Sequence, residues 1–269
     1  MTMSNLEIFC VTNKKVFFLE NTNYNLAAVG KGDFNKNYIR CDNGDNIYYK
    51  EKNYSELTFH YWLWKNRLNK FNDDTWIALC QKRRFWLNSR KNDEKNKPIK
   101  DKILNSIPDE WSNFDSVICE PIYLGTKLSK LIKRGWKNIL YKPSLIFNYK
   151  KITIKEQFDM HHGFGTIEKA ANLLGKDDKK DFLNYISNNT KFNPHIMCVA
   201  KKKILNSYFK DQFKWLFECE KVFGFKSLKN YDQTRLYAFL AERYLSFWFK
   251  KYSNYTEWPW LFYEENKNE

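Results

Sequence analysis

Short apolar segments separated by helical patterns are the feature that most constrains the fold of this chain. Four such segments are bounded by polar or turn-forming residues: 6–12, 75–80, 116–119 and 196–200. Strands that are apolar along their whole length are typical of parallel sheets covered by helices on both faces. We therefore predict an α/β fold with a mostly parallel central sheet flanked by helices.

The 269 residues are predicted to form a single domain, 1–269, that becomes helix-rich after Pro143. The helical candidates in this later part are 166–174, 179–187, 201–223 and 232–251. Residues 88–108 are dense in Lys, Asn and Asp, which predicts an exposed loop with the character of a lid.

The composition is that of a folded, strongly basic protein. Hydrophobic residues make up 43% of the chain, aromatic residues make up 18%, and the formal net charge is +15. No apolar segment approaches the roughly 20 residues of a membrane-spanning helix, and no basic n-region precedes the first one, so we expect a cytoplasmic protein. The charge favours nucleotide phosphates, nucleic acid or an anionic membrane surface, and it fits a solvated surface equally well.

The cysteines and histidines show no metal-binding pattern. The six cysteines have no close pairing and the four histidines form no cluster at zinc-ligand spacing, so we predict reduced, structural thiols and no structural zinc. Gly-x-Gly-x-x-Gly and Walker sequences are absent too, which disfavours Rossmann oxidoreductases and P-loop kinases.

A turn of small polar residues, Gly44-Asp45-Asn46-Ile47, leads into an aromatic helix. Asn53 is the predicted N-cap of that helix, and Glu56 three residues later would complete a variant capping box. Ligands of open α/β sheets bind beyond the carboxyl ends of the strands. This turn, Asn13, residues 80–84 and Glu120 are therefore candidates for one crevice.

The last helical pattern carries an arginine on its apolar stripe. At about 100° per residue, Arg243 falls among apolar side chains, so it needs a partner. A buried ion pair, a guanidinium that reaches solvent, and a contact with an anion or acceptor are the three alternatives. Glu242 is expected to project from a different side of the helix, where it would line a cleft or face water.

Several motifs occur in an order that characterises one known family. In this chain they are Val11-Thr12-Asn13-Lys14, the segments 44–47, 54–58, 61–66, 80–84, 158–162 and 193–197, and Glu242-Arg243-Tyr244-Leu245. On these motifs the chain resembles the capsular and exopolysaccharide biosynthesis proteins, a glycosyltransferase-like family of formerly unknown function. The resemblance spans nearly the whole chain, and its most specific part is the block 44–66.

The resemblance implies a GT-A-like, Rossmann-related fold and a nucleotide-sugar-dependent hexosyltransferase. The donor would be a UDP-sugar, with galactofuranose or another hexose transferred to a glycan or lipid-linked acceptor of a surface polysaccharide. Residues 6–150 would bind the nucleotide sugar, and the helical part 151–263 would face the acceptor. A basic, aromatic surface suits peripheral association with the inner face of the membrane.

Two departures from the family pattern bear on the chemistry. Asn13 replaces a histidine, and Gln81-Lys82 replaces His-Tyr, which argues against proton transfer at both places. Typical GT-A enzymes carry Asp-x-Asp for a divalent cation where this chain has cations. Lys82, Arg83 or Arg84 would neutralise the leaving diphosphate directly, which disfavours a Mn²⁺ or Mg²⁺ cofactor without excluding one. If the strand continued, the two arginines would point to opposite faces, and only one would bind phosphate.

Glycosyl transfer needs stabilisation of the leaving diphosphate and, for inversion, a carboxylate that takes the acceptor proton. The candidate catalytic carboxylates are Asp45, Glu56 and Glu242. The candidate donor or phosphate contacts are Thr12, Asn13, Lys14, Asn46, Lys82, Arg83 and Arg84. The candidate acceptor or sugar contacts are Tyr54, His161, His162, Asn193 and Arg243. Each carboxylate also has a structural interpretation, as a turn residue, a helix cap or a salt-bridge partner, and each histidine has one as an ordinary core or surface residue.

Two other functions stay open at this point. A basic nucleic-acid-binding protein would show a steep dependence of oligonucleotide affinity on salt, but the aromatic residues follow helical periodicity and no nucleic-acid motif is present. A catalytically degenerate scaffold of the same family would account for the altered Asn13 and Gln81-Lys82, and would neither transfer nor hydrolyse a sugar donor.

Overall fold

A computed structural model describes residues 6–90, 97–126 and 151–265. The chain divides into two compact units. The sheet unit comprises Met1–Glu120, His195–Asp211 and Trp248–Glu269, and the helical unit comprises Pro121–Pro194 and Gln212–Phe247.

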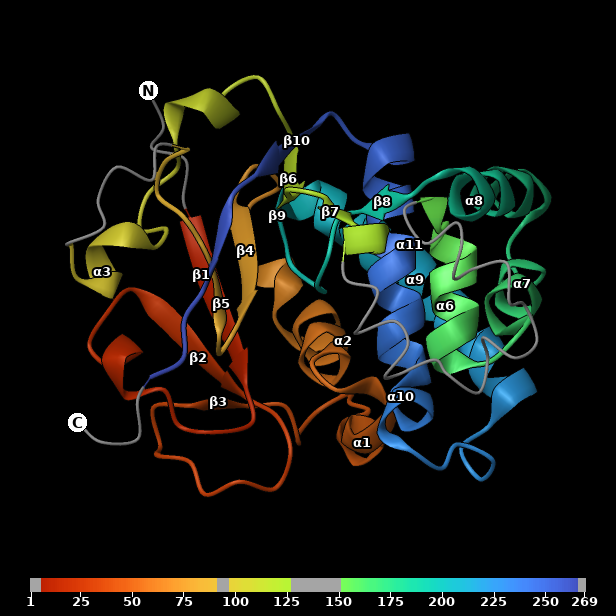
Figure 1. The fold of residues 1–269 in the computed structure, drawn as a ribbon. Helices are drawn as coiled ribbons and strands as arrows, with labels where there is room; N and C mark the ends of the chain where they lie inside the picture. The colour runs from red at the N-terminus through yellow and green to blue at the C-terminus, as the bar shows by residue number, and fades with distance from the viewer. Residues whose placement is uncertain (1–5, 91–96, 127–150, 266–269) are drawn as a thin grey trace. The chain divides into compact units, whose positions relative to one another are not determined.

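The sheet unit is built on a mostly parallel sheet whose strands appear in Figure 1 in the order β10-β6-β9-β4-β1-β2-β3. The strands are β1 (Leu6–Thr12), β2 (Tyr24–Ala28), β3 (Ile39–Arg40), β4 (Trp76–Gln81), β6 (Ser116–Cys119), β9 (Cys198–Lys201) and β10 (Tyr255–Trp258). Only β9 runs antiparallel to its neighbours in this row of described strands. The predicted α/β class with a largely parallel sheet is confirmed.

The chain order creates a switch point in this sheet. From β1 the chain adds β2 and β3 on one side, and it then crosses to add β4 on the other side of β1. The connections that leave the carboxyl ends of β1 and β4 therefore lead to different sides, and ligands of open α/β sheets bind at such a switch point.

The side chains of alternate residues of β1 pack into two different apolar layers, as expected from the period of two in a strand. Ile8 and Cys10 belong to a core cluster with aromatic residues such as Trp86 and Trp111. Phe9 faces the other layer, where its ring lies 5.6 Å from that of Phe59 on α2 (Leu57–Asn66). Both faces of the sheet are thus covered, which explains the continuous apolar sequence.

The chain after β4 reverses in a hairpin with β5 (Arg84–Trp86), and β11 (Trp260–Phe262) pairs antiparallel with β5. The expectation of an exposed loop over 88–108 needs correction. Within the described part of that segment, α3 (Ile99–Lys102) leads to Ile103 and Leu104, which are 1% and 0% exposed. The amide of Leu104 donates to the carbonyl of Trp86 at 2.8 Å, so these two apolar residues anchor the segment in the core.

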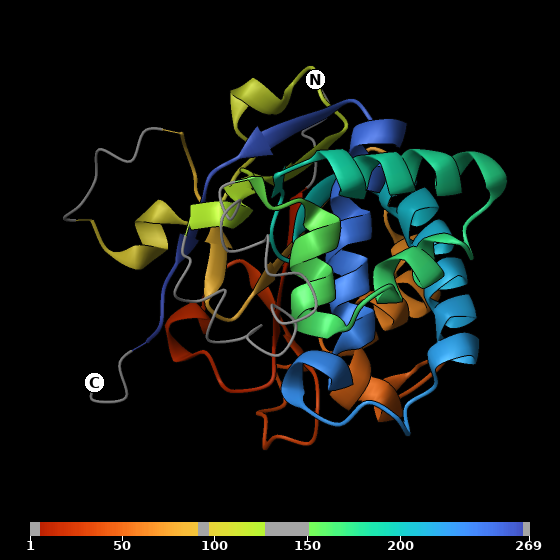
Figure 2. The same cartoon turned by 45° about the vertical axis from the view of Figure 1, so that its right-hand side comes forward.

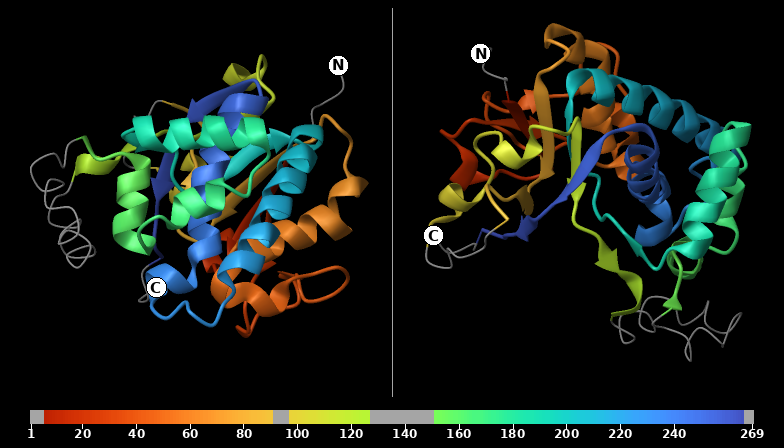
Figure 3. Two further views of the ribbon diagram at one scale, coloured as in Figure 1. Left: turned by 90° about the vertical axis from the view of Figure 1, so that its right-hand side faces the viewer. Right: turned by 90° about the horizontal axis from the view of Figure 1, so that it is seen from above.

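The helical unit contains α6 (Ile154–His162), α7 (Thr166–Ala171), α8 (Lys176–Asn188) and α10 (Tyr231–Thr234). It also contains the later part of α9 (Lys202–Phe223), most of α11 (Leu236–Tyr252), and a small sheet of β7 (Ile122–Tyr123) with β8 (Lys191–Phe192). In Figures 2 and 3, α8 crosses the direction of α6 and α11.

Aromatic side chains join the helices of this unit. The ring of Phe182 on α8 lies 5.8 Å from Trp215 on α9 and 5.2 Å from Phe247 on α11, and Trp215 lies 4.7 Å from Tyr244. The predicted helix-rich later part is confirmed, although β9, β10 and β11 come from within residues 151–263 and belong to the sheet unit.

Candidate functional site

The carboxyl ends of β1 and β4 carry polar residues on both sides of the switch point. The amide of Lys82 donates to the carbonyl of Val11 at 3.2 Å, so the ends of β1 and β4 stay hydrogen-bonded up to these residues. Beyond it, the Lys82 ammonium donates to the side-chain oxygen of Asn13 at 2.5 Å. The predicted neighbourhood of Asn13 and the 80–84 segment is therefore present within the sheet unit.

Thr12 has a local task at the end of β1. Its side chain is buried, its hydroxyl donates to the carbonyl of Lys14, and it accepts the Lys14 amide at 3.0 Å. This turn directs the exposed residues Asn13 and Lys14 away from the strand. Thr12 shapes the turn, and the side chains that a ligand would meet there are those of Asn13 and Lys14.

The strand does not continue through Arg83 and Arg84, so the condition under which the two arginines would point to opposite faces is not met. The strand β4 ends at Gln81, Lys82 and Arg83 form the turn, and Arg84 pairs with Gln81 as the first residue of β5. Arg84 donates to the Gln81 side chain at 3.2 Å, and Arg83 donates to Glu264 at 3.1 Å. Both guanidinium carbons lie within 6 Å of the centre of the Phe262 ring.

The turn that contains Asp45 is clamped by α2. The Asn66 carboxamide accepts the Asp45 amide at 3.0 Å and donates to the Asp45 carbonyl at 2.7 Å. Gly44 has a φ of +59°, and a Cβ there would lie 2.2 Å from the Asn66 side-chain oxygen. The Asn66 side chain can bind the turn only because position 44 is a glycine. This dependence explains why both residues, 22 positions apart, occur in the motif.

Asp45 is exposed, and its carboxylate accepts the hydroxyl of Tyr61 at 3.0 Å. Burial, with the nearby Asp45 carboxylate as a second cause, raises the pKa of Tyr61 to about 12, so its hydroxyl remains a donor at neutral pH. Asn46 stabilises the same turn, because it accepts the Tyr48 amide and donates to the Gly44 carbonyl. The arrangement orients one exposed carboxylate on a fixed turn.

The helix start after this turn differs from the prediction. Asn53 lies inside a single-turn helix, α1 (Glu51–Tyr54), which ends at Ser55 with a φ of +52°. The next helix begins at Leu57, and Glu56 occupies its N-cap position without a side-chain cap bond. The predicted capping box is wrong, because the positive φ of Ser55 interrupts the helix between its two members. Tyr54 is fully buried and packs in the core.

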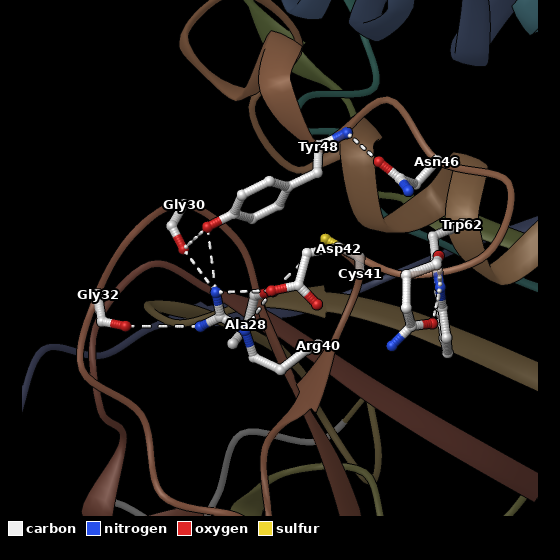
Figure 4. Close-up of polar contacts among 10 residues, drawn as sticks. Ala28, Gly30, Gly32, Arg40, Cys41, Asp42, Asn46, Tyr48 and Trp62 are labelled. Carbon is white, nitrogen blue, oxygen red and sulfur yellow. Dashed lines mark hydrogen bonds and ion pairs between the residues drawn. The ribbon is translucent and has the colours of Figure 1, made fainter.

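A second polar cluster, which the sequence did not reveal, lies at the carboxyl ends of β2 and β3 (Figure 4). Arg40 donates to the carbonyls of Gly30 and Gly32, to the Tyr48 hydroxyl at 3.1 Å and to Asp42 at 3.3 Å. The Tyr48 hydroxyl donates to Gly30 at 2.7 Å. Three separate segments meet at this guanidinium, and of these only the glycine sequence 30–32 has a composition typical of an unusual turn.

In the helical unit, Arg243 faces inward as predicted and is 3% exposed. It donates to Glu242 and, at 2.9 Å, to the side-chain oxygen of Gln157, and its guanidinium carbon lies 4.0 Å from the centre of the Phe192 ring. The expectation that Glu242 projects from a different side is wrong, because the Glu242 carboxylate pairs with the buried guanidinium of Arg243. Of the three alternatives for Arg243, the structure contains the buried ion pair.

The polar contacts continue from Arg243 to His161. Gln157 donates from its side-chain nitrogen to Nδ1 of His161 at 3.0 Å, because its oxygen already accepts from Arg243. His162 is buried, with Nδ1 at 2.8 Å from the Asp232 carbonyl and its ring stacked 4.1 Å from Phe239. Asn193 is buried too, and its backbone amide donates to the Ser246 hydroxyl at 3.0 Å. His162 and Asn193 thus have contacts within the unit, and sugar-binding roles for His161, His162 and Asn193 stay predictions.

The cationic side chains at the switch point are not ligands for a divalent cation. Lys82, Arg83 and Arg84 are donors, whereas Mg²⁺ and Mn²⁺ bind carboxylate, carbonyl and water oxygens. Across residues 6–90, 97–126 and 151–265, no group of three His, Cys, Asp or Glu side chains is arranged to hold a metal ion. The six cysteines are all free and buried, and burial raises the pKa of Cys41 to about 11. Among the helices of the described residues, none has the length and apolar character to cross a membrane.

Comparison with known proteins gives one family and one solved structure. Residues 7–254 match the family described as a domain of unknown function, DUF4422. The bifunctional glycosyltransferase WbbM, solved in its apo form, is similar to this chain with a TM-score of 0.70 and 18% identity. The match covers 97% of this chain and 46% of the WbbM chain, so this chain spans less than half the length of that protein. No curated protein matches the sequence.

The structural likeness confirms the predicted GT-A-like, Rossmann-related fold. The description of the matched family carries no activity, so the glycosyltransferase-like character predicted from the motifs stays a prediction. The capsular and galactofuranosyl assignments stay predictions.

Proposed function

The chain belongs to the DUF4422 family. We propose that it is a glycosyltransferase that uses a nucleotide-sugar donor. The donor is a UDP-sugar, with galactofuranose or another hexose as the transferred group. The acceptor is a glycan or lipid-linked intermediate of a surface polysaccharide, reached at the cytoplasmic face of the membrane. The fold likeness to WbbM, which is named a glycosyltransferase, supports the activity class.

One observation carries this proposal: cationic side chains gather at the switch point between β1 and β4. Lys82 and Arg83 form the turn beyond β4, and Lys82 contacts Asn13 beyond β1. Ligands of open α/β sheets bind at such points, and a departing nucleoside diphosphate needs positive charge. A guanidinium supplies that charge with two parallel hydrogen bonds, so we propose donor binding without a divalent cation.

For the acceptor proton, Asp45 is the carboxylate best suited in the sheet unit. It is exposed, its backbone is clamped by Asn66, and the Tyr61 hydroxyl orients its carboxylate. Such orientation without burial suits a general base that must reach an acceptor hydroxyl. Glu242 is less suited, because the buried guanidinium of Arg243 already uses its carboxylate.

The test is an assay of UDP release from a panel of UDP-hexoses, in pyranose and furanose forms, with and without saccharide acceptors and in the presence of EDTA. Release that depends on an acceptor and survives EDTA is the expected result. Turnover that appears only with added Mn²⁺ would contradict the metal-independent part of the proposal. No turnover and no binding with any nucleotide sugar would contradict the transferase itself.

A further inference from the structure

An acidic segment lies against the cations of the switch point. The strand β11 pairs with β5, with Phe262 opposite Arg84, and the Tyr263 amide then donates to the Arg83 carbonyl at 3.0 Å. The Tyr263 ring packs edge-on against Phe18, with ring centres 5.0 Å apart. Backbone pairing and ring packing therefore hold residues 260–263 beside the turn of the β4–β5 hairpin.

The next two residues place carboxylates on donors of the sheet unit. Glu264 accepts from the Arg83 guanidinium at 3.1 Å. Glu265 accepts the backbone amides of Phe17 and Phe18, at 3.3 and 3.1 Å, with its two oxygens. Phe17 and Phe18 follow β1, and Arg83 follows β4, so the two glutamates engage donors beyond both strands of the switch point.

We propose that residues 263–265 form an autoinhibitory contact in which the Glu264 carboxylate occupies the guanidinium that would bind the donor diphosphate. The proposal rests on the proposed function, since it assigns Arg83 to the donor. The diphosphate of the donor and Glu264 compete for the same N–H groups, so donor binding releases Glu264 from Arg83. Glu265 holds the segment in place through the two amides while Glu264 exchanges.

The exposure of the pair suits an exchangeable contact. The side chain of Arg83 is 40% exposed and that of Glu264 is 61% exposed, so water screens their attraction and the pair contributes little to folding. A diphosphate carries more charge than one carboxylate and can accept two parallel hydrogen bonds from the guanidinium. The carboxylate is therefore strong enough to lower the donor affinity and weak enough to be displaced.

The test compares the affinities of the full chain and of Glu264→Gln for inorganic pyrophosphate and for UDP, measured by calorimetric titration. We expect Glu264→Gln to bind both probes about threefold to tenfold more tightly, the size of effect expected for removing one exposed ion-pair competitor. Glu218→Gln is the matched control, because Glu218 is also exposed and paired, with Lys221, and the substitution removes the same charge. Glu265→Gln should give a smaller gain, since it loosens the segment and leaves Glu264 in place.

The outcomes separate this inference from the proposed function. If wild type binds UDP and Glu264→Gln binds it equally tightly, the autoinhibitory contact is overturned and the donor site stands. A gain of equal size in Glu218→Gln would also overturn it, because net charge alone would then explain the effect. If Glu264→Gln gains affinity for pyrophosphate while no nucleotide is preferred over pyrophosphate, the contact is supported and the proposed function fails. If no variant binds either probe, both are overturned.

Discussion

Arg83 in the sheet unit and Arg243 in the helical unit each form an ion pair with a glutamate, in opposite surroundings. The Arg83 and Glu264 side chains are 40% and 61% exposed, whereas those of Arg243 and Glu242 are 3% and 16% exposed. A buried charge must keep its partner, because no water can replace it, while an exposed charge can exchange its partner for a ligand. Burial, more than residue type, therefore separates arginines that hold the fold from those that can bind a substrate.

The largest expected effect is on the buried pair. Glu242→Gln should lower the free energy of unfolding by about 3 kcal/mol or more, because the Arg243 guanidinium loses its counter-charge in a dry environment. Urea unfolding followed by tryptophan fluorescence measures this, with Glu264→Gln as the exposed counterpart that should change stability little. Equal unfolding midpoints for wild type and Glu242→Gln would break the comparison.

The next effect concerns turnover at an exposed position. Asp45→Asn should reduce turnover by about 100-fold or more, in the range of a lost general base, while the unfolding midpoint stays close to that of wild type. Asp74→Asn serves as the control, since Asp74 is also an exposed aspartate of the sheet unit. If Asp45→Asn lost stability and activity in parallel, the role of Asp45 would be purely structural and the general-base assignment would be contradicted.

A buried histidine in the sheet unit should make the stability of the fold depend on pH. Burial lowers the pKa of His60 to about 3, while the unfolded chain has a value near 6.5, so the folded state resists protonation. Stability is therefore complete above about pH 6.5 and falls as the pH decreases, by roughly 2 kcal/mol at pH 5 relative to pH 8 for this residue alone. His60→Leu should flatten that part of the pH profile of unfolding, and an unchanged slope would contradict the assignment.

The extent to which the sequence predicts the fold depends on how local the signal is. The strands 6–12 and 116–119 occur at the predicted bounds, because continuous apolar runs between polar residues report double-sided burial directly. The helix start was misplaced, because the φ of Ser55 is a backbone feature that no side-chain pattern encodes. Leu104 was expected to be exposed because it lies in a polar segment. Two apolar residues nevertheless suffice to anchor this segment, since the Trp86 carbonyl accepts the Leu104 amide.

The candidate site shows the same limit. The closeness of Asn13 and Lys82 followed from the rule on strand ends, since it needs only the topology of a parallel sheet. The Arg40 cluster requires three segments to meet, and the contacts of Glu264 and Glu265 join residues more than 180 positions apart in the sequence. Such long-range polar contacts depend on the folded geometry, so neither motif spacing nor periodicity reveals them.

The smallest effect in this series tests the central claim most directly. The claim is that exposed cations at the switch point bind the donor diphosphate. The measurement is a calorimetric titration of wild type, Arg83→Gln and Arg90→Gln with UDP in EDTA, where Arg90 is an arginine of similar exposure paired with Glu120. We predict that wild type and Arg90→Gln bind UDP, and that Arg83→Gln binds it about tenfold or more weakly, as expected for a lost charged hydrogen bond. Equal affinities of Arg83→Gln and wild type, or binding by wild type only after Mn²⁺ is added, would contradict the claim.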